Sequence, residues 1–335
     1  MTQPVRLSRP RSGGPLITAR PCLTFCGKLR RPRRRRDTWV KESDALKRLL
    51  IIRNPTAGQR RARHYARALS LLKEAGCTVT EAETGARGDA ERFAREADEA
   101  AFDAVVAAGG DGTINEVVNG LAGRKLPLGV IPLGTSNVLA HEIGVESDIT
   151  RAVRTILSGR RRPVAAANAG GRYCCLMVSA GSDARAITRV RPALKRLIGE
   201  GAYYVAGFQE LLAGPRRKIA VEIDGKPYEA ASVIVMNGRL YGGKFTCAPD
   251  ADMREPLLCA VLLTRAGRWN VMRYGLALVA NRLYRLGDVQ VVPATRVRIL
   301  APAGEPCQSD GDLIGEAPLE ISVEPAVVDM LFPAA

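Results

Sequence analysis

The residues most capable of chemistry lie in the stretch 109–116, which reads Gly-Gly-Asp-Gly-Thr-Ile-Asn-Glu. Because glycine has no Cβ, Gly109, Gly110 and Gly112 allow a sharp turn and a close approach of the backbone to a ligand. A turn that opens a helix presents backbone N–H groups and the positive end of the helix dipole, which attract phosphate. The carboxylate of Asp111 can hold a phosphate through Mg²⁺. The stretch therefore predicts a nucleotide site.

Two further turns rich in small polar residues occur in the same half of the chain. Residues 54–58 read Asn-Pro-Thr-Ala-Gly, and residues 132–137 read Pro-Leu-Gly-Thr-Ser-Asn. The first lacks the Lys-Ser/Thr pair of a Walker A loop, and none of the three turns has the dinucleotide spacing Gly-x-Gly-x-x-Gly. The turns therefore indicate a phosphate site of another kind.

The elements around these turns alternate between short apolar strands and amphipathic helices. Apolar runs at 49–52, 105–108 and 128–131 each lead into one of the turns. This βαβαβαβ order predicts an α/β domain with a doubly wound parallel sheet. Ligands of such sheets bind beyond the carboxyl ends of the strands, so we expect the three turns to meet at that edge.

The pattern changes near Pro163 to one typical of antiparallel strands. Residues 218–223 alternate between polar and apolar side chains, and Asp224-Gly225 follows as a hairpin signal. We predict a second domain built mainly as an antiparallel sheet or sandwich. Further strands are expected at 232–236, 257–263, 295–300 and 319–323, and helices at about 183–212 and 268–286.

The net charge of +16 over 335 residues is concentrated at the N-terminus. Residues 1–44 hold ten Arg and two Lys against three acidic residues, so 12 − 3 = +9, which leaves +7 for the other 291. We interpret 1–44 as a disordered, solvated extension; an electrostatic tether to anionic lipid or nucleic acid is the alternative. The chain has no specific nucleic-acid signal.

Eight cysteines and two histidines show no zinc-type clustering, which argues against a histidine-based metal site. Reduced thiols favour a cytosolic protein. No run of about 18 apolar residues occurs, and the N-terminus lacks the apolar region of a secretory signal. We therefore expect a cytoplasmic location.

Taken together, the three turns resemble the diacylglycerol kinase catalytic-domain family, in particular its bacterial soluble lipid kinases, which are similar to sphingosine and ceramide kinases. The similarity runs from about Leu46 to the C-terminus. It implies an ATP-binding α/β domain at 45–165 (plus about 325–335), followed by a β-sandwich lipid-substrate domain at 166–324. In this family the active site lies in the cleft between the two domains.

The resemblance also assigns roles to residues of this sequence. In the family the general base lies in an Asp-Gly-Glu segment, and Asp312 of Asp310-Gly311-Asp312 falls where that Glu would be, one methylene shorter. A solvated Asp-Gly turn is the alternative. Asp111 would bear on Mg²⁺ as well as on the nucleotide. The residues expected to bind ATP are Asn54, Pro55, Thr56, Ala57, Gly58, Thr84, Gly109, Gly110, Asp111, Gly112, Thr113, Ile114, Asn115 and Thr135.

The resemblance further implies a structural Mg²⁺ loop in the second domain. The Asp250 side chain would be a ligand, with the carbonyls of Cys247 and Asp252 beside it, although Glu255-Pro256 replaces the family's following Asp-Gly. The basic stretch 267–285 is interpreted as a core-facing helix, with contact to a membrane surface as the alternative.

We thus expect an ATP- and Mg²⁺-dependent kinase that phosphorylates the hydroxyl of diacylglycerol or a related lipid alcohol. Its lipid substrate would lie at a membrane surface, with the protein peripheral at the inner membrane, and a homodimer is the assembly to consider. An NAD kinase-like enzyme is one alternative, although the turns at 54–58 and 132–137 argue against it. A non-catalytic nucleotide or lipid sensor with a basic tail is another.

Overall fold

A parallel sheet begins the described part of the chain. All six residues of its third strand and all five of its fourth are buried, as expected for strands covered on both faces. The pairing order is β2-β1-β3-β4. The predicted α/β fold with a parallel sheet is confirmed. The four strands are β1 (Arg48–Arg53), β2 (Thr78–Glu83), β3 (Ala104–Gly109) and β4 (Leu128–Pro132).

The computed structural model describes residues 46–55, 59–188 and 218–334. These residues belong to one compact unit that spans Ala45–Ala335. Three sets of predictions lie outside the described residues: the extension at 1–44, the nucleotide-turn residues Thr56, Ala57 and Gly58, and most of the helix expected at 183–212. The described beginning of that helix is α6 (Ser182–Thr188).

Helices cover both faces of the parallel sheet. Leu50 and Ile52 of β1 pack into the core cluster that includes α3, whereas Leu49 and Ile51 pack into the cluster that includes α1. This alternation follows from the strand geometry, in which successive side chains point to opposite faces. The helices are α1 (Gln59–Glu74), α2 (Asp89–Glu96), α3 (Asp111–Leu121), α4 (Val138–Glu142) and α5 (Ile149–Ser158).

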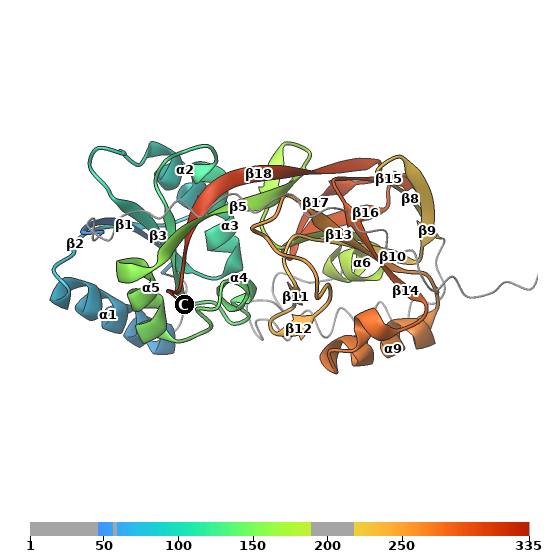
Figure 1. Ribbon diagram of the computed structural model, residues 1–335, viewed down its shortest axis with the longest axis horizontal. Helices are drawn as coiled ribbons and strands as arrows, with labels where there is room; N and C mark the ends of the chain where they lie inside the picture. The colour runs from blue at the N-terminus through green and yellow to red at the C-terminus, as the bar shows by residue number, and fades with distance from the viewer. Residues whose placement is uncertain (1–45, 56–58, 189–217, 335) are drawn as a thin grey trace, which may run out of the picture. The chain divides into compact units, whose positions relative to one another are not determined.

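One long strand near the C-terminus joins the parallel strands to the antiparallel ones. It is β18 (Leu319–Phe332), which runs beside β5 (Arg160–Ala169) over most of its length (Figure 1). Met330 of β18 pairs in parallel with Leu128 of β4, and the other end of β18 pairs antiparallel with β15 (Arg296–Ala301). A ten-stranded sheet therefore continues across both predicted domains.

A second sheet of six strands, in the order β14-β13-β10-β7-β16-β17, completes an antiparallel sandwich. Ile219, Val221 and Ile223 of the first sheet share a buried cluster with Val233 and Val235 of the second. The predicted β-sandwich is confirmed. Its strands are β7 (Met177–Ala180), β8 (Ile219–Ile223), β9 (Lys226–Ala230), β10 (Ser232–Met236), β13 (Leu258–Leu263), β14 (Val289–Ala294), β15 (Arg296–Ala301), β16 (Pro306–Ser309) and β17 (Asp312–Glu316).

The remaining described elements show where the sequence pattern was incomplete. Asp224 and Gly225 have φ of 46° and 79°, so the predicted hairpin turn is present between β8 and β9. The helix expected at 268–286 ends earlier, at Val279, because Asn281 adopts a left-handed conformation (φ 55°). The short elements are β6 (Arg172–Cys174), β11 (Leu240–Tyr241), β12 (Phe245–Thr246), α9 (Arg268–Val279) and the 3₁₀ helix η1 (Leu283–Arg285).

Candidate active site

The three predicted turns meet at the carboxyl edge of the parallel sheet. The Asn54 N–H donates to the Ala108 carbonyl at 3.1 Å, which joins the first turn to the end of β3. The N–H groups of Leu133 and Gly134 donate to the Gly109 carbonyl at 2.9 and 3.2 Å, which joins the third turn to the second. The structure therefore brings the described residues of the three turns together.

The second and third turns touch through their glycine backbones. A Cβ on Gly134 would lie 2.6 Å from the Gly110 Cα, closer than real Cβ contacts, so this packing requires glycine. A Cβ on Gly109 would meet the Thr113 side chain at 2.6 Å. Thr113 is accordingly buried over Gly109, where its hydroxyl lies 3.5 Å from Asn54 Nδ2. Gly134 was not among the predicted site residues.

Helix α3 begins at this junction without a side-chain cap, directly after Gly110. An uncapped helix start, with Gly112 open to solvent, suits an anion such as a phosphate group. Ile114 contributes less than predicted, because its side chain is fully buried and its N–H donates to the Gly110 carbonyl. The Oδ1 atom of Asn115 is buried without a hydrogen-bond partner.

Asp111 fixes the start of a second helix. Its carboxylate accepts the N–H of Val138 at 3.0 Å and of Leu139 at 2.9 Å, at the beginning of α4. A carboxylate is also an oxygen ligand of the kind that Mg²⁺ accepts. Among the described residues, no cluster of three or more His, Cys, Asp or Glu could hold a metal. A Mg²⁺ at Asp111 would therefore take most of its ligands from phosphate and water.

The loop after β2 reaches the same edge. Thr84 donates its N–H to the Arg53 carbonyl at 2.9 Å, which leaves it beside the end of β1. The N–H groups of Gly85 and Ala86 both donate to the Asp89 carboxylate at 2.9 Å. The hydrogen bonds from these N–H groups lower the pKa of the Asp89 carboxylate, and the bond from Gly85 has the larger effect. The loop is thereby held in place.

In the third turn, Thr135 is exposed, and its hydroxyl accepts a hydrogen bond from Arg61 of α1. Asn137 begins α4 in a left-handed conformation (φ 44°), and its side-chain amide donates to the Gly134 carbonyl at 2.8 Å. Asn137 thus supports the turn, and Thr135 stands at its solvent-facing side.

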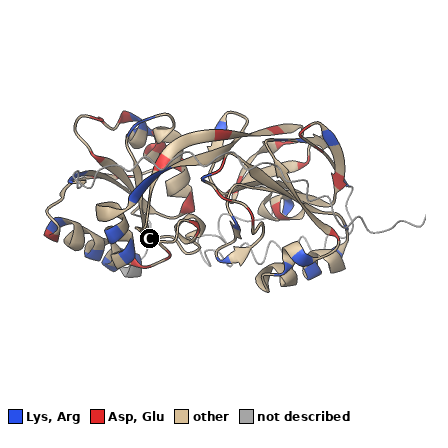
Figure 2. Cartoon of the chain, viewed as in Figure 1, with Lys and Arg blue, Asp and Glu red and all other residues tan. Residues whose placement is uncertain are grey.

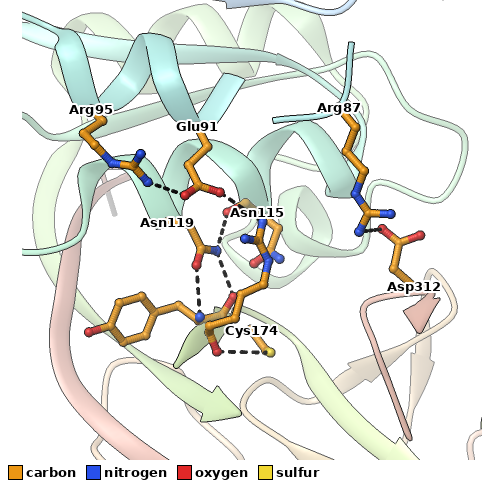
Figure 3. A network of polar contacts seen from close by, with 9 residues as sticks. Arg87, Glu91, Arg95, Asn115, Asn119, Cys174 and Asp312 are labelled. Atoms are coloured by element: carbon orange, nitrogen blue, oxygen red, sulfur yellow. Dashed lines mark hydrogen bonds and ion pairs between the residues drawn. The ribbon is translucent and has the colours of Figure 1, made fainter. Parts of the chain in front are cut away.

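The predicted base directly follows a tight turn between β16 and β17. Asp310 and Gly311 have φ of 49° and 93°, which matches a two-residue hairpin turn. Asp312 follows as the first residue of β17, and its Oδ2 lies 3.1 Å from Nη2 of Arg87. Figure 3 shows this pair reaching across from β17 to the loop that precedes α2 (Figure 3). Through Arg87, Asp312 therefore reaches the carboxyl edge of the parallel sheet, where the three predicted turns gather.

Asp310, which the sequence analysis did not single out, is the better anchored carboxylate. It accepts the N–H groups of Cys175, Leu176 and Met177 at 3.1, 3.3 and 2.9 Å. Burial raises the pKa of Asp310 to about 7; the backbone N–H groups oppose this rise, and the nearby charge of Asp111 adds to it. Asp310 and Asp111 therefore lie within electrostatic reach of each other. The Asp-Gly pair was the signal that could have identified Asp310.

A polar network behind this turn ties it to the second sheet. The Gln308 amide donates to Ser179 Oγ at 2.6 Å and to Asp183 at 3.2 Å, and its carbonyl accepts the Gly311 N–H at 2.9 Å. Tyr241 donates to Asp183 at 3.2 Å. Burial raises the pKa of Asp183, while these hydrogen bonds oppose the rise. The network positions the Asp310–Asp312 turn and was not predicted.

Helix α3 is held against the second half of the chain by Asn119. Its Oδ1 accepts the Tyr173 N–H at 3.0 Å, and its Nδ2 donates to the Tyr173 carbonyl at 2.9 Å (Figure 3). Arg172 of the same strand pairs with Glu91 of α2 at 3.1 Å. These contacts fix the C-terminal part of α3, and α2, relative to β6, which leads to the backbone N–H groups that Asp310 accepts.

The residues predicted for the second metal site differ in their exposure and in the partners that they bind. Cys247 is fully buried, and burial raises the pKa of its thiol to about 12. Asp250 is exposed, whereas the Asp252 carboxylate is bound by Arg254 at 2.6 and 2.8 Å and its carbonyl accepts the Glu255 N–H. The Asp252 carbonyl is thus already engaged, and metal binding at this loop stays a prediction.

Comparisons with known proteins agree with this architecture. Residues 48–169 match the model of the diacylglycerol kinase catalytic domain, and residues 176–332 match the YegS C-terminal NAD kinase beta sandwich-like domain. A diacylglycerol kinase of Bacillus subtilis (strain 168) is 32% identical over 82% of this chain and 93% of its own length. The chain belongs to the diacylglycerol kinase catalytic-domain family. The predicted family, and with it an enzyme of the lipid kinase class, is confirmed.

Other relatives extend the likeness. A diacylglycerol kinase of Staphylococcus aureus (strain MRSA252) is 31% identical over 66% of this chain and 71% of its own length. Two solved structures from Bacillus anthracis str. Sterne have TM-scores of 0.72 and 0.64 at 23% and 21% identity. Each covers 87% of this chain and 98% of its own, which shows that the fold is shared over nearly the whole of that protein.

Proposed function

We propose that this chain transfers the γ-phosphoryl group of ATP to the hydroxyl of diacylglycerol or a related lipid alcohol. The observation that carries the proposal is the contact of Asp312 with Arg87. It sets a carboxylate of the sandwich beside the sheet edge that holds an uncapped helix start and the described residues of the three turns. Phosphoryl transfer to an alcohol requires a site that binds the phosphates and, in contact with it, a group that accepts the proton of the hydroxyl.

The nucleotide phosphates would bind at the start of α3, through backbone N–H groups near Gly110 and Gly112. Asn54, Thr84 and Thr135 follow strand ends at the same edge of the sheet and would offer polar groups to the rest of the nucleotide. The same role extends by sequence to residues 55–58. Arg61 and Arg87 add positive charge at this edge, which favours a polyphosphate.

Asp111 fits Mg²⁺ by its chemistry, because a carboxylate held at the start of α4 is a ligand that Mg²⁺ accepts beside phosphate oxygens. Bound Mg²⁺ would neutralise charge on the phosphates. Asp111 itself would orient α4 and the third turn. The predicted second-domain loop, with Asp250 and the carbonyls of Cys247 and Asp252, remains a candidate for a structural Mg²⁺.

Asp312 would accept the proton of the lipid hydroxyl while the hydroxyl oxygen attacks the γ-phosphorus and ADP leaves. The Asp312 side chain is shorter than the family's Glu. Its position is supported by a rigid hairpin turn, by the hydrogen bonds that Asp310 accepts from three backbone N–H groups, and by the bond that Gln308 accepts from the Gly311 N–H. Such positioning is the main source of catalysis in phosphoryl transfer.

The proposal includes a cytoplasmic protein that works peripherally at the inner membrane, and a homodimer as its assembly. No helix in the described part of the chain is long and apolar enough to cross a bilayer. A kinase that acts on NAD is the second candidate, since the family model of the second domain is described as NAD kinase-like.

A lipid panel with the full-length chain tests the proposal. The protein is incubated with γ-labelled ATP and Mg²⁺, and with diacylglycerol, ceramide, sphingosine or NAD in parallel. We expect label in a glycerolipid or sphingolipid product and none in NADP. Label in NADP alone would favour the second candidate, and nucleotide binding without any labelled product would indicate a non-catalytic sensor.

A further inference from the structure

Helix α9 carries a stripe of exposed apolar side chains. Trp269, Met272, Leu276 and Val279 have exposed fractions of 74, 39, 65 and 58%. Their spacing of three, four and three residues puts all four on one face of the helix. They make up four of the seven large apolar residues that are exposed in the described part of the chain. Such a concentration on one helix marks an interaction surface.

The opposite face of α9 is already packed against the protein. Tyr274 is 5% exposed and belongs to the same buried cluster as Val261 and Leu283, with Ala277 and Leu278 packed against it. A surface helix normally turns polar residues to solvent on the face away from its core. Helix α9 is instead apolar on both faces, so its outer face is suited to a second apolar environment.

Positive charge surrounds this apolar stripe. Residues 264–287 contain five arginines and no acidic residue. Figure 2 shows basic positions along α9 and none that is acidic (Figure 2). At roughly 100° per residue, Arg268 and Arg273 lie on the two sides of the stripe. Arg282 and Arg285 follow beyond the helix end, and both are exposed.

Part of this charge is uncompensated. Arg265 and Arg273 share Asp288, with Arg265 Nε at 3.5 Å from its carboxylate. Within the described part of the chain, Arg268, Arg282 and Arg285 form no ion pair with an acidic side chain. The surface thus combines exposed apolar side chains, an indole ring and unpaired guanidinium groups.

We propose that the outer face of α9 docks the protein on the surface of an anionic lipid bilayer. The apolar side chains would enter the boundary between head groups and acyl chains, and the arginines would contact the anionic head groups. Tryptophan suits this boundary because its ring is amphipathic. The inference rests on the proposed function, since a lipid kinase must reach a substrate that lies in a membrane.

A second copy of the chain is a poorer occupant of this surface. In a twofold dimer the same patch would face itself, which would bring the unpaired arginines of both copies together. No acidic residue within 264–287 could compensate them. The charge therefore favours an anionic partner over self-association.

Vesicle binding of the full-length protein, without ATP, tests the proposal. Sedimentation with phosphatidylcholine vesicles is compared with sedimentation with vesicles that also contain phosphatidylglycerol. We expect binding that needs the anionic lipid and weakens with salt. The double substitution Trp269→Ser/Leu276→Ser should lower the partition coefficient at least tenfold, and Arg268→Glu should lower it on anionic vesicles.

The matched control is Leu257→Ser, which removes an apolar side chain that is 40% exposed and lies outside α9. It should bind as the unaltered protein does. In a Trp39→Phe background, lipids brominated near the head groups should quench the remaining Trp269. Thermal melting of each variant checks that the fold is retained, which substitution of exposed side chains should preserve.

Equal binding of the α9 variants and the unaltered protein would overturn the proposal and assign any binding to another part of the chain. A change from dimer to monomer in the double variant, measured by light scattering, would overturn it in favour of a second copy. Phosphorylation of a monomeric short-chain diacylglycerol distinguishes the two proposals. The α9 variants should keep this activity, whereas its absence in the unaltered protein would contradict the proposed function and leave vesicle binding unaffected.

Discussion

Arg87 Nη2 lies 3.1 Å from Asp312 Oδ2, so a cation from the loop after β2 contacts the carboxylate that we propose as the general base. The two side chains are 71 and 48% exposed, and an exposed ion pair contributes about 1 kcal/mol or less to stability. The contact therefore matters for position more than for folding. It links the sandwich turn to the phosphate edge.

Replacing Arg87 by alanine should lower kcat roughly tenfold with little effect on stability, because Asp312 and the phosphates lose a positioning cation. Steady-state kinetics on mixed micelles and chemical denaturation measure the two effects. Arg92→Ala, in the next helix and also exposed, is the control and should leave kcat unchanged. An unaltered kcat in Arg87→Ala would show that the pair has no role in the reaction.

Replacing Asp111 by asparagine should affect both stability and catalysis. The amide loses the charge and one acceptor for the α4 N–H groups, which should lower the free energy of unfolding by about 1–3 kcal/mol. Loss of the charge that we propose binds Mg²⁺ should lower kcat/KM for ATP by at least about 100-fold. Glu96→Gln, which removes an exposed charge on α2, should change neither. If Asp111→Asn melts earlier but turns over normally, Asp111 only supports α4.

Replacing Gly134 by alanine should weaken nucleotide binding. The added Cβ would meet the Gly110 Cα at 2.6 Å, so the second and third turns would have to separate. We expect the KM for ATP to rise roughly tenfold, by analogy with other overpacked contacts that cost about 1–3 kcal/mol. Gly287→Ala, where a Cβ meets nothing within 4 Å, is the matched control. An unchanged KM would contradict a nucleotide site at this junction.

Stability should depend on pH through Asp310. Its pKa is raised from 3.8 to about 7 in the folded protein, chiefly by burial. A carboxyl group whose pKa is raised on folding stabilises the fold at pH values below its pKa in the unfolded state. That stabilisation is lost as pH rises through 7. The linkage amounts to about 4 kcal/mol at most between pH 4 and 8.

Denaturation of the unaltered protein and of Asp310→Asn at pH 5 and pH 8, without Mg²⁺, measures this linkage. The asparagine side chain cannot ionise. The free energy of unfolding of Asp310→Asn, relative to that of the unaltered protein, should therefore be higher at pH 8 than at pH 5. A difference between the two proteins that stays constant with pH would show that Asp310 titrates normally.

The sequence predicts those parts of the fold whose side chains follow a simple pattern. The apolar runs of β1, β3 and β4, the alternation of β8 and the Asp224-Gly225 turn all lie where the pattern indicated. Strand β16 was missed because it buries Gln308 and Ser309, polar residues that do not read as a core strand. The single strand β18 was read as a short strand because its centre contains Pro325 and charged residues.

The site can be predicted from the sequence where it depends on local backbone conformation. It cannot be predicted where it depends on contacts between residues far apart in the chain. The glycines at 109 and 110 indicate a turn from sequence alone, because glycine has no Cβ, and the structure adds that a Cβ at 109 would lie 2.6 Å from Thr113. The approach of Asp310 to Asp111, and of Arg87 to Asp312, depends on how two halves of the chain pack. Residues 225 positions apart in the chain, such as 87 and 312, leave no local pattern that reveals their contact.

The most direct test of the central claim is the initial rate of lipid phosphorylation by the full-length protein and by Asp312→Asn. With γ-labelled ATP, Mg²⁺ and diacylglycerol in mixed micelles, the unaltered protein should form labelled phosphatidate. The Asp312→Asn variant should fold normally and react at least about 100-fold more slowly, while Asp312→Glu should keep much of the rate. Unlabelled lipid with the unaltered protein, or full activity of Asp312→Asn, would contradict the account.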